Sequence, residues 1–376
     1  MARFATELTS GRYPELLPLA AMTPTLFDEL RKCQLRTAYR LDRSFSSFRR
    51  PTLVSALGET SHELAERAGR GEFDETPPER LRTALEEAWD TAVQLRYRGL
   101  REVWTLAPVP PPERWPGYQR TRVRLIRSLS NAIGRRAIAR QTAEDNAAVR
   151  QVHIETWLEP SDLPLRGRPD RIEVTENGVH IIDLKSSWTY GDEIRDEHRA
   201  QLLLYCAIWE RLTGELPRMA SIQTADGTRL SFAVTSADVS ACVAEALSAL
   251  DGYNAAVNRR APPSELASPS PGTCRYCVYR GCCMPFFGVL SAAWEWWPRT
   301  LHGTLTGKSD GAATSSLVIA VTASNLDNAP AEARVRGVPS PLTPALGTTL
   351  SIVDACPTIS AAEVSVTWNT QLVAYG

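Results

Sequence analysis

The 376-residue chain lacks any long apolar run, because no stretch reaches the roughly 18 hydrophobic residues of a transmembrane helix. Its first residues, "MARFATELTSGRYPELLPLA", also lack the hydrophobic core of a signal peptide. We therefore expect a cytoplasmic protein with no membrane partner. A chain of this length and ordinary composition can bury a large core, and we expect a soluble protein of two or three domains.

The chain also has little net charge, because 42 Lys and Arg against 43 Asp and Glu leave a net charge of −1. No overall field therefore indicates a nucleic-acid partner. The basic residues are nevertheless unevenly spread. Residues 31–50 hold seven basic residues and one acid, and residues 118–140 hold seven arginines and no acid. Either segment alone is equally well explained as a solvated helix face, but two of them flanking a catalytic core suit a phosphate backbone.

No internal repeat and no nucleotide-binding motif is visible. The segment "HGTLTGKS" (302–309) ends like a P-loop, but His302 stands where that motif needs its first glycine. The residues that follow alternate as in a strand rather than a helix. We therefore expect no ATPase in this chain, so that any motor must be a partner.

Three regions differ in periodicity. Helical spacing of apolar residues extends to about residue 105 and, after a proline-rich break, resumes over 118–142. From about residue 150 strand-like and helical stretches alternate. Five short alternating runs after Trp297 predict a small β-barrel, for which an OB-like barrel is the candidate. The expected domains are a helical region containing His62 (1–148), an α/β core ending in a cysteine cluster (149–292) and a small all-β domain (298–376).

One segment of the core, "GRPDRIEVTENGVHIIDLKSS" (167–187), is predicted to be a β-hairpin. Asn177-Gly178 is the strongest two-residue hairpin signal, so we expect it to form the loop. That loop makes Asp170 face Lys185, and it leaves Asp170 and Asp183 as diagonal neighbours roughly 7–8 Å apart at the backbone. All three side chains then project from one face of the sheet.

This arrangement has a chemical use. Two converging carboxylates suit Mg²⁺ or Mn²⁺, and a nearby lysine can stabilise charge that develops on a phosphate. The alternative is a solvated hairpin face with a cross-strand Asp–Lys pair. Ile172, Val174 and Ile181 share the face, which predicts that it is covered, and covered carboxylates need a partner.

Two further segments offer candidate site residues. Gln201 and Tyr205 lie four apart on one face of the helix predicted after the hairpin. His62, in "GETSHELAERA", lies on an N-terminal helix; such a histidine is usually structural, but here it can supply an imidazole ligand. The cluster "WEWWP" (294–298) is expected to pack a domain junction rather than to stack bases.

Eight cysteines in a cytoplasmic chain indicate metal binding or buried thiols rather than disulfides. Cys274, Cys277 and Cys283 have the spacing C-x₂-C-x₅-C, while Cys33 lies far upstream. A zinc site would more often have two close cysteine pairs, so this set favours an iron–sulfur cluster with four thiolates. Cys282 is an alternative last ligand. The remaining cysteines are expected to be buried small hydrophobes: Cys206, Cys242 and Cys356.

Taken in order, these motifs resemble the RecB-like branch of the PD-(D/E)xK nuclease superfamily. They are similar to the iron–sulfur CRISPR-adaptation exonucleases and to the nuclease domain of the AddB helicase–nuclease subunit, over about residues 25–290. The resemblance implies an α/β fold with a restriction-endonuclease-like core, a mixed sheet flanked by helices. It also implies a metal-dependent DNA nuclease with a structural [4Fe–4S] cluster.

The resemblance also implies residue roles, and it makes Glu155 the candidate for an acidic position just upstream. Asp170 and Asp183 would bind the metal together with His62 and the Leu184 carbonyl. Lys185 would be the catalytic lysine. Gln201 and Tyr205 would orient the site or the DNA strand. The cluster ligands would be Cys33, Cys274, Cys277 and Cys283.

Three functions remain open. The first is an active exonuclease or single-strand- or end-directed enzyme on DNA, in repair, recombination or antiphage defence. The second is a non-catalytic nucleic-acid-binding subunit. The third is a nuclease that works only inside a helicase or defence complex. Because both aspartates and Lys185 are retained, the first is favoured.

Overall fold

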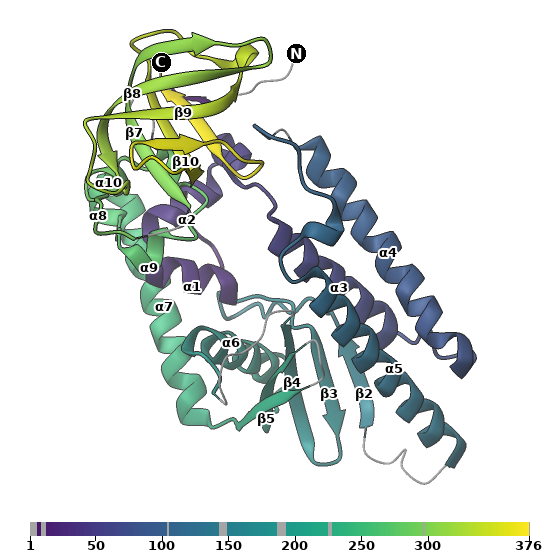
Figure 1. The fold of residues 1–376 in the computed structure, drawn as a ribbon. Coiled ribbons are helices and arrows are strands. Elements are labelled where there is room, and N and C mark those ends of the chain that lie inside the picture. The colour runs from purple at the N-terminus through teal and green to yellow at the C-terminus, as the bar shows by residue number, and fades with distance from the viewer. Residues whose placement is uncertain are drawn as a thin grey trace.

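The computed structural model describes residues 6–8, 13–103, 105–142, 149–185, 193–224, 228–295 and 298–375 (Figure 1). The predicted turn at Asp226-Gly227 lies outside these residues, as do Trp296 and Trp297 of the tryptophan cluster. Trp294, which is described, packs against Phe286 with the two rings tilted by 58° and their centroids 5.7 Å apart.

The N-terminal part is helical, as predicted. Thr23 caps the first helix, and Thr52 and Ser55 form a capping box on the third. The proline-rich segment carries only the short helix η2 (Pro112–Arg114). The helices are α1 (Pro24–Lys32), α2 (Gln34–Leu41), η1 (Arg43–Phe48), α3 (Leu53–Gly69), α4 (Pro78–Glu102) and α5 (Tyr118–Thr142).

A five-stranded sheet forms the core, in the order β2-β3-β4-β5-β6. Strands β4 and β5 are parallel and the other neighbours are antiparallel, so the predicted mixed sheet is confirmed. Helix α6 (Asp196–Thr213) is the crossover that a parallel pair requires. The strands are β2 (Val149–Ile154), β3 (Arg171–Thr175), β4 (Gly178–Lys185), β5 (Met219–Thr224) and β6 (Arg229–Ala233).

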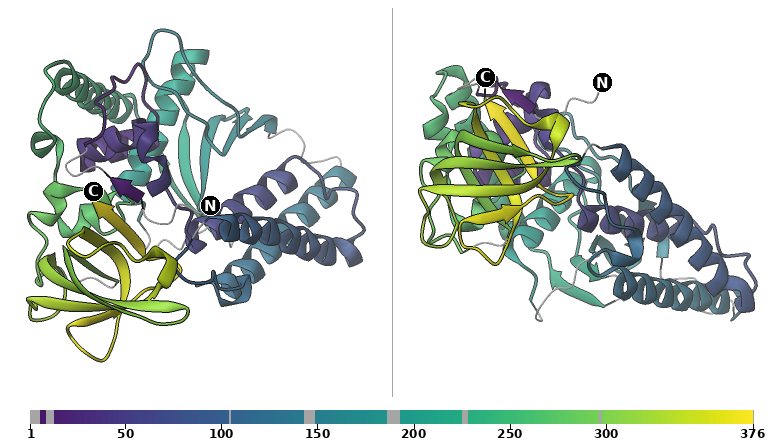
Figure 2. Two further views of the ribbon diagram at one scale, coloured as in Figure 1. Left: turned by 90° about the horizontal axis from the view of Figure 1, so that it is seen from above. Right: turned by 45° about the horizontal axis from the view of Figure 1, so that its top comes forward.

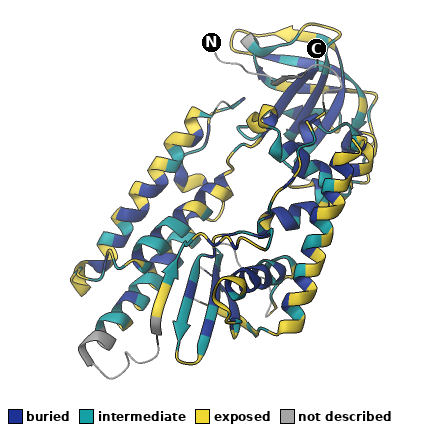
Figure 3. Ribbon diagram, turned by 180° about the vertical axis from the view of Figure 1, so that it is seen from behind, coloured by how far each residue is buried: buried dark blue, intermediate teal, exposed yellow. Residues whose placement is uncertain are grey.

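Helices cover the sheet on both sides. The buried residues Ile172, Ile181 and Ile222 form one hydrophobic cluster with α6, α7 (Ser236–Asn258), α1 and α2. Figure 3 shows how buried residues gather along α6. Helices α3, α4 and α5 share a second cluster of their own and form an arm beside β2 (Figure 1). The carboxylate-bearing hairpin is therefore enclosed between two helical layers.

The register of the β3–β4 hairpin differs from the prediction by two residues. Ile172 pairs with Ile181 rather than with Asp183, and Thr175 pairs with Gly178. The loop is Glu176-Asn177, because the Thr175 hydroxyl accepts from the Asn177 N–H (3.1 Å) and donates to the Gly178 carbonyl (2.8 Å). Gly178 closes the turn with a φ of 107°, which favours glycine. A shift of two keeps every side chain on its predicted face.

After α7 the chain makes short turns around the cysteines. It then enters the barrel. These turns are α8 (Pro263–Leu266), α9 (Pro271–Cys274), η3 (Arg280–Cys282) and α10 (Met284–Phe287).

The C-terminal part is a β-barrel. Strands β7, β8, β9, β11 and β10 pair in that order, and the pairing of β10 with β7 closes a five-stranded barrel, the strand number of an OB fold. The predicted five strands are confirmed, and the P-loop-like residues 302–309 lie inside β7. The elements are β7 (Arg299–Asp310), β8 (Thr314–Ser324), β9 (Glu332–Pro339), η4 (Ser340–Leu342), β10 (Thr349–Pro357) and β11 (Glu363–Ser365).

Two barrel-associated strands were not predicted. Strand β12 (Gln371–Tyr375) pairs with β10, and β1 (Thr6–Leu8), from the other end of the chain, pairs with β12 in parallel. In both views of Figure 2 the purple β1 lies beside the yellow β12, so that these two strands from distant parts of the chain both lie at the barrel. Among the described residues, no helix is both long and apolar enough to cross a membrane. The division at 148 and 298 stays a prediction.

Candidate active site and cysteine cavity

Asp170 and Asp183 meet where the β3–β4 hairpin opens. The register places Arg171 opposite Ile182, so that its continuation by one residue sets Asp170 opposite Asp183. The Leu184 N–H donates to Asp170 Oδ2 at 2.5 Å. The Asp183 side chain is buried, and Lys185 Nζ lies 2.6 Å from its Oδ2 atom. The two aspartates are thus direct neighbours rather than diagonal ones.

Helix α6 brings two more of the predicted residues to this pair. Gln201 Nε2 donates to Asp183 Oδ1 (3.0 Å), and Gln201 Oε1 accepts from Lys185 Nζ (3.3 Å). The same amide donates to the Tyr205 hydroxyl at 3.4 Å. Gln201 and Tyr205 reach this position because they lie one turn apart on α6. Asp183, Lys185, Gln201 and Tyr205 therefore form one connected polar network.

A glycine in the "GRPD" segment makes this approach possible. A Cβ atom on Gly167 would lie 2.6 Å from the Tyr205 ring and 3.3 Å from Pro24. A glycine at this position lets Tyr205 of α6 pack directly on the backbone that leads into Asp170. The sequence motif thus has a packing reason as well as a chemical one.

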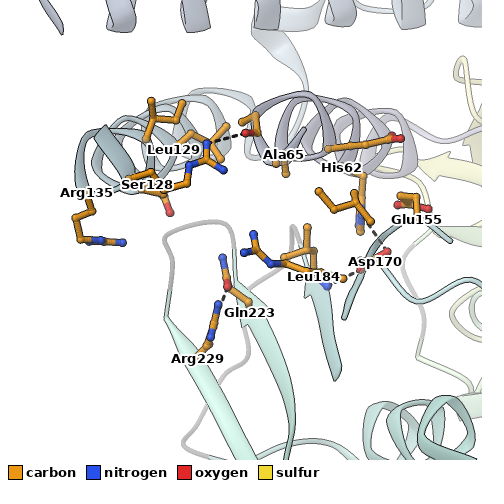
Figure 4. Close-up of a pocket in the computed structure, with 18 residues that line it drawn as sticks. His62, Ala65, Ser128, Leu129, Arg135, Glu155, Asp170, Leu184, Gln223 and Arg229 are labelled. Atoms are coloured by element: carbon orange, nitrogen blue, oxygen red, sulfur yellow. Dashed lines mark hydrogen bonds and ion pairs between the residues drawn. The ribbon is translucent and has the colours of Figure 1, made fainter. Parts of the chain in front are cut away.

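His62 and Glu155 complete the acidic side of the site. His62 Nδ1, on α3, lies 3.7 Å from Asp170 Oδ1. One ligand atom from each of His62, Glu155 and Asp170 lies within 4.8 Å of the others. Glu155 ends β2 in a left-handed conformation (φ 50°), and its N–H donates to the Asp170 carbonyl at 3.1 Å. Figure 4 shows these three side chains turned toward one another from α3, β2 and β3.

The electrostatics of the three groups favour a bound cation. Burial, and then the negative charge of Asp183, raise the pKa of Asp170 well above its usual range. Burial also raises the pKa of Glu155. Burial lowers the pKa of His62, which keeps its imidazole neutral and able to act as a ligand. Asp170 and Glu155 are thus two buried carboxylates whose negative charge is unfavourable without a cation nearby. A hard divalent cation that accepts oxygen and imidazole ligands would stabilise them.

A cleft of about 550 Å³ opens beside this acidic group, between the α3–α5 arm and the sheet. Its lining includes Arg135 of α5 and Gln223 and Arg229 of the sheet, which face each other across the cleft in Figure 4. The sequence analysis did not single out these residues, because they are far apart in the chain. His198, on the first turn of α6, was also not predicted to belong to the site. Burial, and then the charge of nearby Lys185, lower its pKa.

The four cysteines proposed as cluster ligands lie around one separate cavity. Cys33, Cys274, Cys277 and Cys283 line it together with Tyr39 and other side chains. Cys33 stands between α1 and α2, and its thiol lies 3.8 Å from the Leu266 carbonyl, which belongs to α8. Cys282 is absent from the lining; its thiol donates to the Tyr279 carbonyl at 3.2 Å.

Burial dominates the chemistry of this second site. It raises the pKa of Cys274 to about 11, and it also raises the pKa values of Cys277 and Cys283. Thiols in such a setting stay protonated unless a metal stabilises the thiolates. Arg36 and Arg280 are the nearby positive groups that act against this effect at Cys277.

The cysteine segment also holds the barrel. Arg280 of η3 donates to both carboxylate oxygens of Asp354 at 2.7 Å, and the Tyr375 hydroxyl donates to the Gly281 carbonyl at 2.5 Å. Asp354 has a φ of 62° beside an irregularity in β10, and its carboxylate meets Arg280 from this conformation. The Tyr39 hydroxyl of α2 donates to the Cys282 carbonyl at 3.0 Å. Helix α2, the cysteine turns and the barrel are thus joined at one place.

The comparison with curated proteins finds no match. Among solved structures, the chain is similar to the crystal structure of SSO0001, at 16% identity, a TM-score of 0.24 and coverage of 46% of this chain and 81% of that one. It is also similar to protein VC1899 from Vibrio cholerae, at 14% identity, a TM-score of 0.19 and coverage of 56% of each chain. These likenesses are too weak to support a conclusion about function.

The family comparison covers most of the chain. A model of the PD-(D/E)XK nuclease superfamily matches residues 21–284, which run from just before α1 to just past Cys283 and leave out the barrel. Proteins of this superfamily are generally hydrolytic nucleases that use divalent metals. Their nucleic-acid substrates agree with a site of paired carboxylates and a lysine. This chain belongs to the PD-(D/E)XK nuclease superfamily.

Proposed function

We propose that this protein is a metal-dependent deoxyribonuclease of the RecB-like branch, which hydrolyses phosphodiester bonds at DNA ends or in single strands. The observation that carries the proposal is the network in which Lys185 and Gln201 hold the buried Asp183 carboxylate directly beside Asp170. A lysine beside paired carboxylates suits phosphodiester hydrolysis, because the negative charge that develops on the phosphate must be stabilised.

A Mg²⁺ or Mn²⁺ ion would be held by Asp170 and Asp183, with His62, the Leu184 carbonyl and Glu155 as further ligands. When bound, it would supply Lewis-acid stabilisation of the phosphate and a water of lowered pKa. The donor set of carboxylates, one carbonyl and one neutral imidazole suits either ion and gives Mn²⁺ an added advantage.

Lys185 would be the catalytic lysine. The chain has only three lysines, Lys32, Lys185 and Lys308, and every other basic residue is arginine. An ammonium is a compact point charge, whereas a guanidinium is a wide planar fork, so that the two do not substitute for each other at a tight site. Lys185 Nζ would stabilise the charge that develops on the scissile phosphate, while Asp183 and Gln201 hold it in place.

Gln201 and Tyr205 would position the other groups. The amide of Gln201 contacts both Asp183 and Lys185, so it fixes their relative orientation. Burial raises the pKa of Tyr205, and its phenol therefore stays protonated. A protonated phenol beside Gln201 can orient that amide or a strand of DNA.

The cysteine cavity would hold a [4Fe–4S] cluster on Cys33, Cys274, Cys277 and Cys283. A zinc ion would draw its sulfur atoms to within about 4 Å of one another. Within the described part of the chain, no three cysteine sulfurs lie within 4.8 Å. A cluster separates its thiolates further, because each binds a different iron. The cysteine cavity shares no lining residue with the active-site cleft, so we propose a structural role for the cluster.

The biological setting belongs to the same proposal. A chain with no ATPase motif would act on ends or strands that a helicase partner or a defence complex exposes. Repair, recombination and antiphage defence all produce such substrates. The alternative is a subunit that binds nucleic acid without cutting it.

The test is DNA degradation by anaerobically purified protein with Mn²⁺ or Mg²⁺, on labelled single strands and duplexes. Lys185→Ala and Lys185→Arg should both lose activity by about 10³-fold or more, while Lys32→Ala, which changes an exposed lysine, should cut like the wild type. Equal cutting by wild type and Lys185→Ala would overturn the proposed role of Lys185. If the wild type cuts none of the substrates with either metal ion, the non-catalytic alternative is favoured.

A further inference from the structure

Helices α4 and α5 form a natural comparison, because both have 25 residues and both belong to the same arm. Helix α4 carries five arginines and five acids, whereas α5 carries seven arginines and no acid. The charges of α4 therefore cancel, whereas every charged residue of α5 is positive. The structure shows how that charge is divided between the faces of α5.

Five of the seven arginines of α5 fall into two groups. Arg122 and Arg136 turn toward the arm: Arg122 lies 3.5 Å from Asp90, and Arg136 lies 3.0 Å from Asp74. Three others are exposed and have no ion pair with any described residue: Arg120, Arg127 and Arg135. These three are separated by seven and eight residues, close to two helical turns each, so they share one face. We call them the α5 stripe.

The other basic segment of the sequence does not form such a face. Arg31 and Lys32 pair with Asp28, while Arg36 and Arg40 pair with the buried Glu29. Four of its seven basic residues are thus paired within the fold, and of the other three only Arg43 lies in a helix, the short η1. Within the part of the chain that the structure describes, α5 therefore differs from this segment in carrying three exposed arginines along a single long helix.

One end of the α5 stripe reaches the active-site cleft. Arg135, at its C-terminal end, lines the cleft, and Arg229 of β6 lies opposite (Figure 4). Arg120 and Arg135 are 15 residues apart, which is about 22 Å along the helix axis. The row therefore extends well beyond the cleft and can contact several successive phosphates of one strand.

We propose that the α5 stripe is a phosphate-binding track that guides a single nucleic-acid strand into the cleft. This inference rests on the proposed function for the identity of the ligand, and it names a surface that the catalytic residues do not include. A cleft of about 550 Å³ has the size of a small-molecule pocket and does not admit a duplex. Asp170 lines this cleft together with His62 and Glu155, so we expect a strand to enter it unpaired.

The experiment measures binding without cutting. Fluorescence anisotropy in EDTA would follow a labelled single strand long enough to span α5, over salt concentrations of about 50 to 200 mM. The test variant carries Arg120→Gln, Arg127→Gln and Arg135→Gln. The matched control carries Arg80→Gln, Arg98→Gln and Arg101→Gln, three exposed arginines of α4, which lies on the outer side of the arm (Figure 1).

The stripe variant should bind at least about tenfold more weakly, and its salt slope should fall by about 2, because each lost phosphate contact removes about 0.7. The α4 variant should bind like the wild type. Circular dichroism would establish that both variants keep their helices. Equal loss in both variants, or an unchanged slope in the stripe variant, would overturn the track. Tighter binding of a blunt duplex than of the single strand would overturn the single-strand assignment.

These outcomes separate the track from the proposed function. If the wild type does not cut DNA but its binding depends on the α5 stripe, the track stands and the nuclease proposal fails. If the wild type cuts and the stripe variant binds and cuts equally well, the nuclease proposal stands and the track fails.

Discussion

The carboxylate site takes Asp170, Asp183 and Lys185 from one hairpin and Gln201 and Tyr205 from the next helix. The cysteine cavity instead joins Cys33, near the start of α2, to three cysteines in the turns before the barrel. The first site opens into a cleft of about 550 Å³, whereas the second is a small cavity whose lining includes Arg280, which also holds the barrel. Local chain geometry thus builds the reactive site, and long-range packing builds the buried one.

This difference has a consequence for what each site contributes. Residues of a short, hydrogen-bonded hairpin keep their places without the cleft being filled. The cysteine cavity connects α2, α8, the cysteine turns and the barrel, so that its contents affect the stability of the whole assembly. We therefore expect changes in the first site to remove activity, and changes in the second to remove stability.

The largest expected effect is that of Asp183→Asn. It removes the charge that faces Lys185 and a proposed metal ligand, while the amide keeps the size of the side chain. Cutting should fall by about 10³-fold or more, and the melting temperature in EDTA should change little. Turnover of labelled DNA and a thermal melt of the same samples measure both. If Asp183→Asn instead lowered the melting temperature strongly and kept its cutting activity, the carboxylate site would contribute stability rather than activity, which contradicts our expectation.

Next comes Cys277→Ser in the cysteine cavity. If the cavity holds a cluster, this variant should lose iron and the brown absorbance, and it should unfold at a clearly lower temperature than the wild type. Cys356→Ser, a lone barrel cysteine outside the cavity, is the matched control. Iron content, visible absorbance and melting temperature are measured on all three proteins. Full iron content in Cys277→Ser would exclude that residue as a ligand.

A smaller effect is expected at the joint between the cysteine turns and the barrel. Arg280→Met leaves the Asp354 carboxylate buried without its partner and should reduce the free energy of unfolding by about 3 kcal/mol. Adding Asp354→Asn removes the unpaired charge and should recover part of this loss. Denaturant unfolding of the single and double variants measures the difference. If the double variant is less stable than Arg280→Met alone, the buried charge is not the cause.

The smallest effect is a dependence of metal-free stability on pH. The pKa of Asp170 is raised in the folded protein, so the folded state holds a proton that the unfolded state loses above about pH 4. The stability of the apoprotein should therefore fall as the pH rises from that value toward neutrality. Added Mn²⁺ should restore more stability at higher pH, because its ligands must be deprotonated.

Asp170→Asn should flatten this profile, and Asp251→Asn, at an exposed position of α7, should leave it unchanged. Melting temperatures over the pH range, in EDTA and in Mn²⁺, are the measurement. A profile for Asp170→Asn that follows the wild type would assign the titration to another group.

The sequence predicts much of the carboxylate site, because its residues lie close in the chain and the period of a strand fixes their face. The alternation around Ile172 and Ile181 was sufficient for that, even though the loop was misplaced. The hydrogen bonds of Thr175 that set the true register depend on side-chain geometry rather than on residue type. An error of two residues preserved the face and changed only which residues are opposite.

The rest depended on contacts between distant segments. Nothing in the local sequence places Arg135 beside Arg229, or divides the arginines of α5 between inward pairs and an exposed row. The strands β1 and β12 were missed for the same reason, since a three-residue strand is defined by its partner rather than by its own pattern. Glu155 was recognised only as a candidate, because its place beside His62 and Asp170 follows from the left-handed turn that ends β2.

The most direct test of the account is anomalous diffraction from crystals of the anaerobically purified protein soaked in Mn²⁺. We expect a manganese peak bounded by His62, Glu155, Asp170 and Asp183, and a separate iron peak bounded by the four cysteines. Manganese bound elsewhere, with the carboxylates empty and Lys185 still paired with Asp183, would contradict the central claim that this hairpin is a metal-dependent nuclease site.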